Sequence, residues 1–183
     1  MTRRLFGLLA VLLVSCETVP ATQVVVFLDA DAAVVARAES VEVAVIGTGP
    51  DGETDGASYA VGDGGEFAFP LRISVLPRDG DASRRFRFSA TASDGEGELV
   101  VVRAEMGFAA EQALGVRLLL EGVCIDQTCD SNETCRGGEC TDDIDVDDEQ
   151  FPLDEDGDPT DMGSLADMGP LADGNACVDG DGD

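Results

Sequence analysis

Several residue types that often carry chemistry are missing from this 183-residue chain, which has no histidine, no tryptophan and no lysine, and a single tyrosine. Without histidine no serine has an imidazole to activate it, which excludes a Ser-His-Asp triad. A sugar-binding platform is poorly supported, because stacking needs exposed rings and most phenylalanines stand at alternating positions that suit a core. The sequence therefore excludes a serine-histidine hydrolase and gives poor support to a sugar-binding module.

Positive charge is also scarce. Eleven arginines stand against 38 acidic residues, which gives a formal net charge of −27. Nucleic-acid binding needs clustered Lys or Arg to meet the phosphates, so no nucleic-acid partner is expected. After the first 15 residues, no apolar run approaches the ~20 residues that span a bilayer. The main part of the chain is therefore expected to be soluble.

The chain opens with a short basic segment and an uncharged apolar run. Arg3 and Arg4 precede residues 5–15, and the run ends in Leu13-Val14-Ser15-Cys16. A basic start and an apolar stretch of this length are typical of a secretory signal peptide. The last four residues resemble the lipobox of bacterial lipoproteins. That resemblance implies removal of residues 1–15 and lipidation of Cys16.

The lipobox resemblance implies a place in the cell envelope. In such proteins the cysteine carries a diacylglyceryl group and its new amine is acylated, and two or more acyl chains give stable anchoring. We therefore expect residues 16–21 to be a tether, with the membrane as partner through the lipid. Glu17, in place of an inner-membrane retention aspartate, favours the outer membrane. The alternatives are an unmodified Cys16 in an uncleaved anchor, or a peptide cut elsewhere.

Residues 22–123 alternate apolar and polar side chains with a period of two, the pattern of half-buried strands. The clearest stretch is 85–92, with Phe86 and Phe88 on one face, and residues 41–45, 71–75 and 116–120 alternate in the same way. Apolar runs at 24–28 and 99–102 suit central strands. Glycine- and aspartate-rich turns separate these segments, which predicts an all-β fold, an antiparallel β-sandwich. Residues 31–39 are expected to form a crossover.

This arrangement resembles the immunoglobulin-like, fibronectin type III-like or transthyretin-like sandwiches of bacterial surface proteins. The resemblance implies a spacer or a binding module, and a fold alone does not decide between these roles. The many carboxylates are expected to form a solvated acidic surface.

Four of the six cysteines follow the predicted sandwich in a compact pattern, Cys124-x4-Cys129-x5-Cys135-x4-Cys140. A segment as short as 124–140 cannot bury enough apolar surface to fold without staples, and an exported chain forms disulfides. Three pairings are possible, and we favour Cys124 with Cys135 and Cys129 with Cys140. Zinc is the alternative, disfavoured by the missing Cys-x2-Cys spacing and histidine. The stretch resembles Cys-rich modules of myxobacterial-type lipoproteins, which implies that it caps the sandwich.

Residues 141–183 hold 16 acidic residues and no basic one. Dense charge of one sign with few large apolar residues predicts disorder. Asp-Met-Gly occurs at 161–163 and again at 167–169. These copies resemble spacer repeats of the same kind of surface protein, and two copies are too few for a stacked solenoid. We therefore expect a disordered acidic spacer.

A candidate calcium loop lies in this tail. Asp154, Asp156, Asp158 and Asp161 offer hard oxygen ligands at nearly alternate positions, as in EF-hand or thrombospondin type 3 loops. Two departures weaken the match: Pro159 stands where those loops have glycine, and no glutamate closes the loop. Ca²⁺ is the one possible cofactor that the sequence suggests.

The last residues lead us to expect that the natural chain continues beyond Asp183. Cys177 has no partner in the cluster described above, and residues 179–183 begin a second calcium-like repeat without completing it.

Three functions follow from these patterns. The favoured one is a non-catalytic cell-envelope lipoprotein that acts in surface display, adhesion or partner binding, with an unidentified protein or surface as its partner. The second is an extracellular Ca²⁺-binding protein whose Asp-rich tail orders on the metal. The third, an enzyme, would need a cleft with two facing acids, and we expect no catalytic activity.

Overall fold

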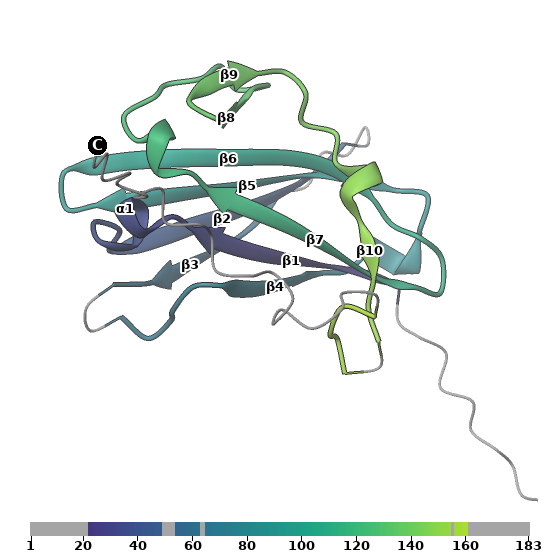
Figure 1. Cartoon of the computed structure of the whole chain (residues 1–183). Coiled ribbons are helices and arrows are strands. Elements are labelled where there is room, and N and C mark those ends of the chain that lie inside the picture. The colour runs from purple at the N-terminus through teal and green to yellow at the C-terminus, as the bar shows by residue number, and fades with distance from the viewer. Residues whose placement is uncertain (1–21, 49–53, 63–64, 155, 161–183) are drawn as a thin grey trace, which may run out of the picture.

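The computed structural model describes residues 22–48, 54–62, 65–154 and 156–160. Two four-stranded sheets face each other, and the predicted β-sandwich is confirmed (Figure 1). The first sheet has the order β10-β7-β1-β4, formed by Phe151–Pro152, Ala113–Leu120, Gln23–Ala30 and Leu71–Val75. The second has the order β3-β2-β5-β6, formed by Thr54–Ala60, Ser40–Gly47, Arg85–Asp94 and Gly97–Gly107.

Most strand pairs are antiparallel, as predicted. The exception is β1 with β7, which run parallel with Gln23 opposite Ala113 and Ala30 opposite Leu120. Short helices connect the strands: α1 (Ala32–Val35), η1 (Arg78–Gly80), η2 (Gly122–Cys124) and η3 (Asp147–Glu149). Helix α1 occupies the stretch expected to be a crossover. It is held by the carboxylate of Asp31, which accepts a hydrogen bond from the Gly122 N–H at 2.7 Å.

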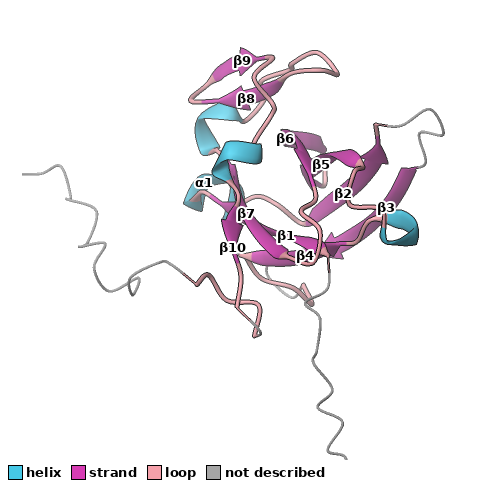
Figure 2. Ribbon diagram, turned by 90° about the vertical axis from the view of Figure 1, so that its right-hand side faces the viewer, coloured by secondary structure: helices cyan, strands magenta, loops and turns pink. Residues whose placement is uncertain are grey.

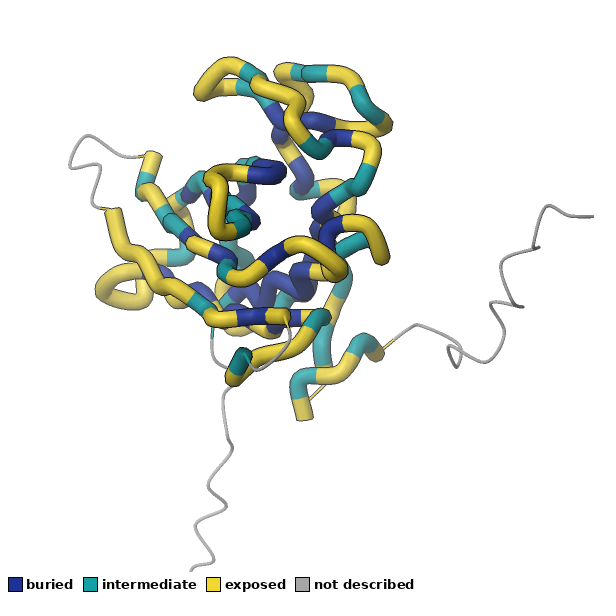
Figure 3. The backbone as a smooth tube through the Cα atoms, turned by 90° about the vertical axis from the view of Figure 1, so that its left-hand side faces the viewer, coloured by how far each residue is buried: buried dark blue, intermediate teal, exposed yellow. Residues whose placement is uncertain are grey.

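The core follows the period-two pattern of the strands. On β5 the side chains of Phe86, Phe88, Ala90 and Ala92 are buried between the sheets, while their neighbours in sequence are only partly covered. On β1 the whole run 24–28 is buried, which suits its place between β7 and β4. Figure 3 shows the buried positions lining the inside of the sandwich and continuing to the base of the β8–β9 hairpin.

The cysteine module covers the open edge of β6, the outermost strand of its sheet. The module contains the hairpin β8 (Thr134–Arg136) and β9 (Glu139–Thr141), which lies over this edge in Figure 2. Thr134 is 2% exposed, and its hydroxyl accepts a hydrogen bond from the Arg103 N–H at 3.0 Å. The Asp126 N–H donates to the Leu99 carbonyl at 2.9 Å. The prediction that residues 99–102 form a central strand is therefore wrong: the apolar run reflects cover by the module.

The prediction of disorder from residue 141 onward is wrong for 141–154 and 156–160, which the structure places on the sandwich. We call residues 142–153 the strap. Ile144 and Val146 are buried, and the Glu105 N–H on β6 donates to the Ile144 carbonyl at 2.6 Å. The strap ends as β10, which pairs with β7. Residues 161–183, with the Asp-Met-Gly repeats, lie outside the described residues.

Arg85 explains how so acidic a segment stays bound. Its guanidinium contacts Asp145 at 2.8 Å and Asp147 in a closer ion pair, both on the strap, and Glu105 at 3.7 Å. The hydrogen bond with Asp147 raises the pKa of Arg85 above its ordinary value. The composition of this segment predicts a solvated tail because its acids have no basic neighbour in sequence. In the folded chain, Arg85 supplies the opposite charge.

Candidate functional site

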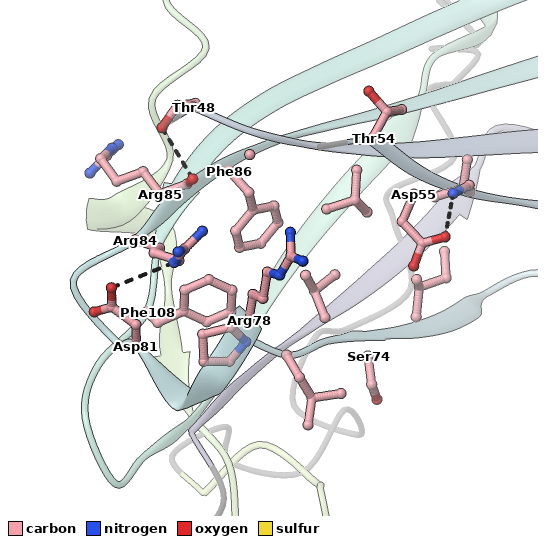
Figure 4. A pocket seen from close by; sticks show the side chains of 18 of the residues that line it. Thr48, Thr54, Asp55, Ser74, Arg78, Asp81, Arg84, Arg85, Phe86 and Phe108 are labelled. Carbon is pink, nitrogen blue, oxygen red and sulfur yellow. Dashed lines mark hydrogen bonds and ion pairs between the residues drawn. The ribbon is translucent and has the colours of Figure 1, made fainter. Parts of the chain in front are cut away.

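An open cleft of about 1070 Å³ lies between the two sheets, on the side where β3 and β4 are the outermost strands. Figure 4 views this cleft from close by. The segment that joins β4 to β5 crosses its end and contributes η1. The opposite side of the sandwich is closed, because β6 and β7 approach each other there under the module and the strap.

The cleft has an apolar floor that the strand pattern explains. Val43 on β2 and Ile73 and Val75 on β4 point inward at alternate positions. Phe86 and Phe108 add a ring pair whose centroids are 4.9 Å apart. Apolar surface of this kind takes up apolar ligand groups in exchange for water.

The rim of the cleft is polar and carries charges of both signs. Arg78, in η1, reaches over the floor in Figure 4. Arg84 contacts Asp81 through Nε at 3.5 Å. Both the hydroxyl and the N–H of Ser83 donate to the Asp81 carboxylate, at 2.6 and 3.0 Å, and these hydrogen bonds lower the pKa of Asp81. Asp81 therefore stays ionised and holds this loop in shape.

Asp55 supplies the second carboxylate of the cleft. It lies opposite Val45 in the β2–β3 register, on the cleft side of β3. Its carboxylate accepts a hydrogen bond from the Gly56 N–H at 2.8 Å, so this N–H does not pair with β2. Asp55 and Asp81 stand at opposite sides of the cleft in Figure 4.

One of the two carboxyl groups of the cleft differs from the general acids of hydrolytic enzymes. A general acid needs a carboxyl group whose pKa is raised, and hydrogen bonding lowers that of Asp81. Asp81 is therefore not suited to act as a general acid.

The structure pairs Cys124 with Cys135 and Cys129 with Cys140, with Cα–Cα distances of 5.9 and 5.5 Å. This is the pairing favoured from the sequence. The module also holds the one group of three potential metal ligands among the described residues, Cys129, Glu133 and Cys140. Because both sulfurs are in a disulfide, neither is a thiolate that could bind zinc.

The predicted calcium residues are brought together only in part. One oxygen of Asp154 accepts hydrogen bonds from the N–H groups of Asp156 and Asp158, at 3.0 and 2.8 Å, and Asp158 forms an ion pair with Arg72 at 2.9 Å. These three carboxylates are not among the clustered groups of the described residues. Asp161, Cys16 and Cys177 lie outside the residues that the structure describes.

Reasoning from the sequence missed the cleft. Residues 54–60, which form one of its walls, have no large apolar alternation and were not predicted as a strand. A weaker signal for a site was present in residues 76–85. This short stretch of a strongly acidic chain contains three arginines, Arg78, Arg84 and Arg85.

No helix among the described residues is long and apolar enough to cross a membrane. The comparisons with known proteins add no relative: the chain matches no protein-family model, no curated protein and no solved structure.

Proposed function

We propose that this chain is the non-catalytic binding module of a lipid-anchored cell-envelope protein, with the open cleft as its contact site. The observation that carries this proposal is the cleft itself: about 1070 Å³ between the sheets, apolar at its floor and charged at its rim. Ligand-binding sites combine an apolar lining with a few polar groups that fix the orientation of the ligand. Leu76, at its edge, leaves 64% of its surface exposed.

The location rests on separate support. The lipobox resemblance around Cys16 implies an acylated amino terminus, and two disulfides suit an oxidising compartment outside the cytoplasm. In this arrangement the lipid holds the chain at the outer membrane and the sandwich presents the cleft. The partner is a protein or another surface component.

Metabolic labelling with an alkyne analogue of palmitate tests the anchor. The wild-type chain and Cys177→Ala take up the label and partition with membranes, whereas Cys16→Ala does neither. Cys177→Ala is a matched control, because neither cysteine belongs to a disulfide of the module. Equal labelling of all three variants, or of none, would remove the anchor from the proposal.

Binding of the purified chain to whole cells tests the contact site. Leu76→Asp places a charge at the cleft and is expected to abolish binding. Val123→Asp is the control, since Val123 is 67% exposed and lies outside the cleft. Equal loss in both variants, or in neither, would rule out the cleft as the contact site.

A further inference from the structure

The outer edge of β3 stands out among the sheet edges of the sandwich. Seven residues pair with β2 on one side, from Thr54 opposite Ile46 to Ala60 opposite Ser40. On the other side, within the part of the chain that the structure describes, the backbone of residues 54–59 has no backbone partner. Six of the seven residues are exposed. An exposed edge of this kind is a template for another strand.

The remaining edges are protected. The module and the strap satisfy the edge of β6, and β10 pairs with β7. Strand β4 has only five residues and stands between Pro70 and Pro77, which donate no backbone hydrogen bond. Strand β3 is longer and contains no proline. It is therefore the edge that accepts a partner most readily.

The direction of the free backbone groups on β3 follows from two contacts. The Gly56 N–H donates to the carboxylate of its neighbour Asp55, and the Ala60 carbonyl accepts a hydrogen bond from the Phe67 N–H at 3.1 Å. Residues 54, 56, 58 and 60 therefore direct their N–H and C=O groups away from β2. A lipid tail or a small apolar molecule could fill the cleft but could not satisfy this row of alternating donors and acceptors. An extended peptide satisfies it.

The side chains around this edge set the character of the peptide. Tyr59 lines the cleft and packs edge-to-face on Phe67 at 5.2 Å, and Leu76 adds exposed apolar surface across the cleft. Alternate side chains of an added strand would face this apolar surface. Arg84 uses Nε for Asp81, which leaves its terminal amino groups for an acidic group of the peptide.

We propose that β3 binds an extended peptide as an additional strand of its sheet, with alternate apolar side chains of the peptide in the cleft and an acidic residue at Arg84. This inference rests on the proposed function and names the class of partner. Asp55, which faces the cleft, disfavours a second acid beside it and so fixes the direction in which the peptide lies. Backbone hydrogen bonds supply affinity, and the apolar positions supply specificity.

A library of displayed random twelve-residue peptides, selected against the full chain, is the probe. The proposal requires selected sequences with apolar residues at alternate positions and an acid towards one end. Binding of a selected peptide is expected to slow hydrogen exchange at Ser58, whose N–H points outward, whereas the Gly56 N–H already donates to the Asp55 carboxylate. Failure to select any peptide, or protection confined to the module, would overturn the inference.

Two variants of the chain make the test sharper. Ser58→Pro removes one outward N–H without removing a bond to β2, and is expected to abolish peptide binding. Arg84→Gln preserves the fold and is expected to weaken binding about tenfold, as for the loss of one charge-assisted hydrogen bond. Arg136→Gln is the matched control, since the side chains of Arg84 and Arg136 are 44% and 47% exposed and Arg136 lies on β8. Unchanged affinity in Arg84→Gln and Ser58→Pro would refute strand addition.

Competition with decanoate separates the peptide from a lipid-like ligand. The inference requires that decanoate fails to displace the selected peptide and fails to protect β3 from exchange. Displacement by decanoate, with Ser58→Pro still binding, would assign the cleft to an amphipathic anion and refute the inference. If no peptide binds but Leu76→Asp still abolishes binding to cells, the proposed function stands and strand addition alone is wrong.

Discussion

Gly115 offers the sharpest test of how the strap binds to the sandwich. Its lack of a side chain leaves room for the ring of Phe151, which holds the strap in place. A Cβ atom at this position of β7 would lie 2.4 and 2.7 Å from two ring carbons of Phe151 and 2.9 Å from Cδ2 of Leu153. Phe151 also contacts the ring of Phe27, at 5.9 Å between centroids, and lies under the guanidinium of Arg117 at 5.5 Å. Gly115→Ala therefore displaces Phe151.

The expected change in stability for Gly115→Ala follows from two contributions. Overpacking costs about 1–3 kcal/mol, and replacing glycine inside a strand returns about 0.5–1 kcal/mol, so Gly115→Ala is expected to destabilise the protein by about 1 kcal/mol. Phe151→Ala is expected to cost about 2 kcal/mol, below the ~3–5 kcal/mol of a fully buried ring, because Phe151 is half-buried. Without the ring the added methyl group fits, so Gly115→Ala becomes neutral or slightly stabilising in the Phe151→Ala background.

Urea denaturation of the four chains of this double-mutant cycle, followed by far-ultraviolet circular dichroism under non-reducing conditions, measures the coupling. We expect a coupling free energy of about 1–2 kcal/mol. Gly95→Ala is the control, since a Cβ there meets the Glu39 carboxylate at an ordinary 3.6 Å and should not couple to Phe151. Equal effects of Gly115→Ala in both backgrounds would show that the ring does not lie on β7.

Three further outcomes are expected. Thr134→Val leaves the part-buried Arg103 N–H without its acceptor and should lower the free energy of unfolding, measured by urea denaturation, by about 1 kcal/mol. Thr134→Ser keeps the hydroxyl and should retain most of the stability. The β5–β6 hairpin should loosen in acid, because the Glu96 N–H and then Arg37 lower the pKa of Asp94 from 3.8. The stability that the Asp94 carboxylate gives the hairpin is complete above about pH 4 and is lost as the pH falls through the lowered pKa. Asp94→Asn should therefore flatten the pH dependence of amide exchange in the hairpin. Reducing the two disulfides should speed amide exchange along the edge of β6 while the β1–β4 pair stays protected; unchanged exchange at β6 would contradict its cover by the module.

The part of the fold that could be predicted is the part set by local alternation. The inward positions of β5 follow directly from 85–92, and the run 24–28 identifies β1 as central because both of its faces are covered. The same reasoning was wrong for 99–102, since a continuous apolar run reports cover on both faces without saying what provides it. On β1 the outward ring of Phe27 is covered by Phe151 and by the guanidinium of Arg72, and on β6 the cover is the module.

The strap and the cleft could not be predicted because each depends on pairing between distant residues. Ile144 and Val146 are two residues apart, a strand-like spacing, but the surrounding acids dominate the composition of that segment. The negative charge of these acids is offset by Arg85, which is 60 residues away in sequence from Asp145. Strand β3 likewise lacks an apolar pattern and exists because β2 pairs with it. Local signals carry no information on such partners.

The parallel pairing of β1 with β7 has a consequence for how the chain folds. Strand β1 appears first and contains five consecutive apolar residues, yet its partner β7 begins only at Ala113, opposite Gln23. Closing so long a loop makes the pairing a late and slow event. Strand β4 can pair with one edge of β1 earlier in folding, but the other edge of this apolar strand stays unpaired until β7 is in place.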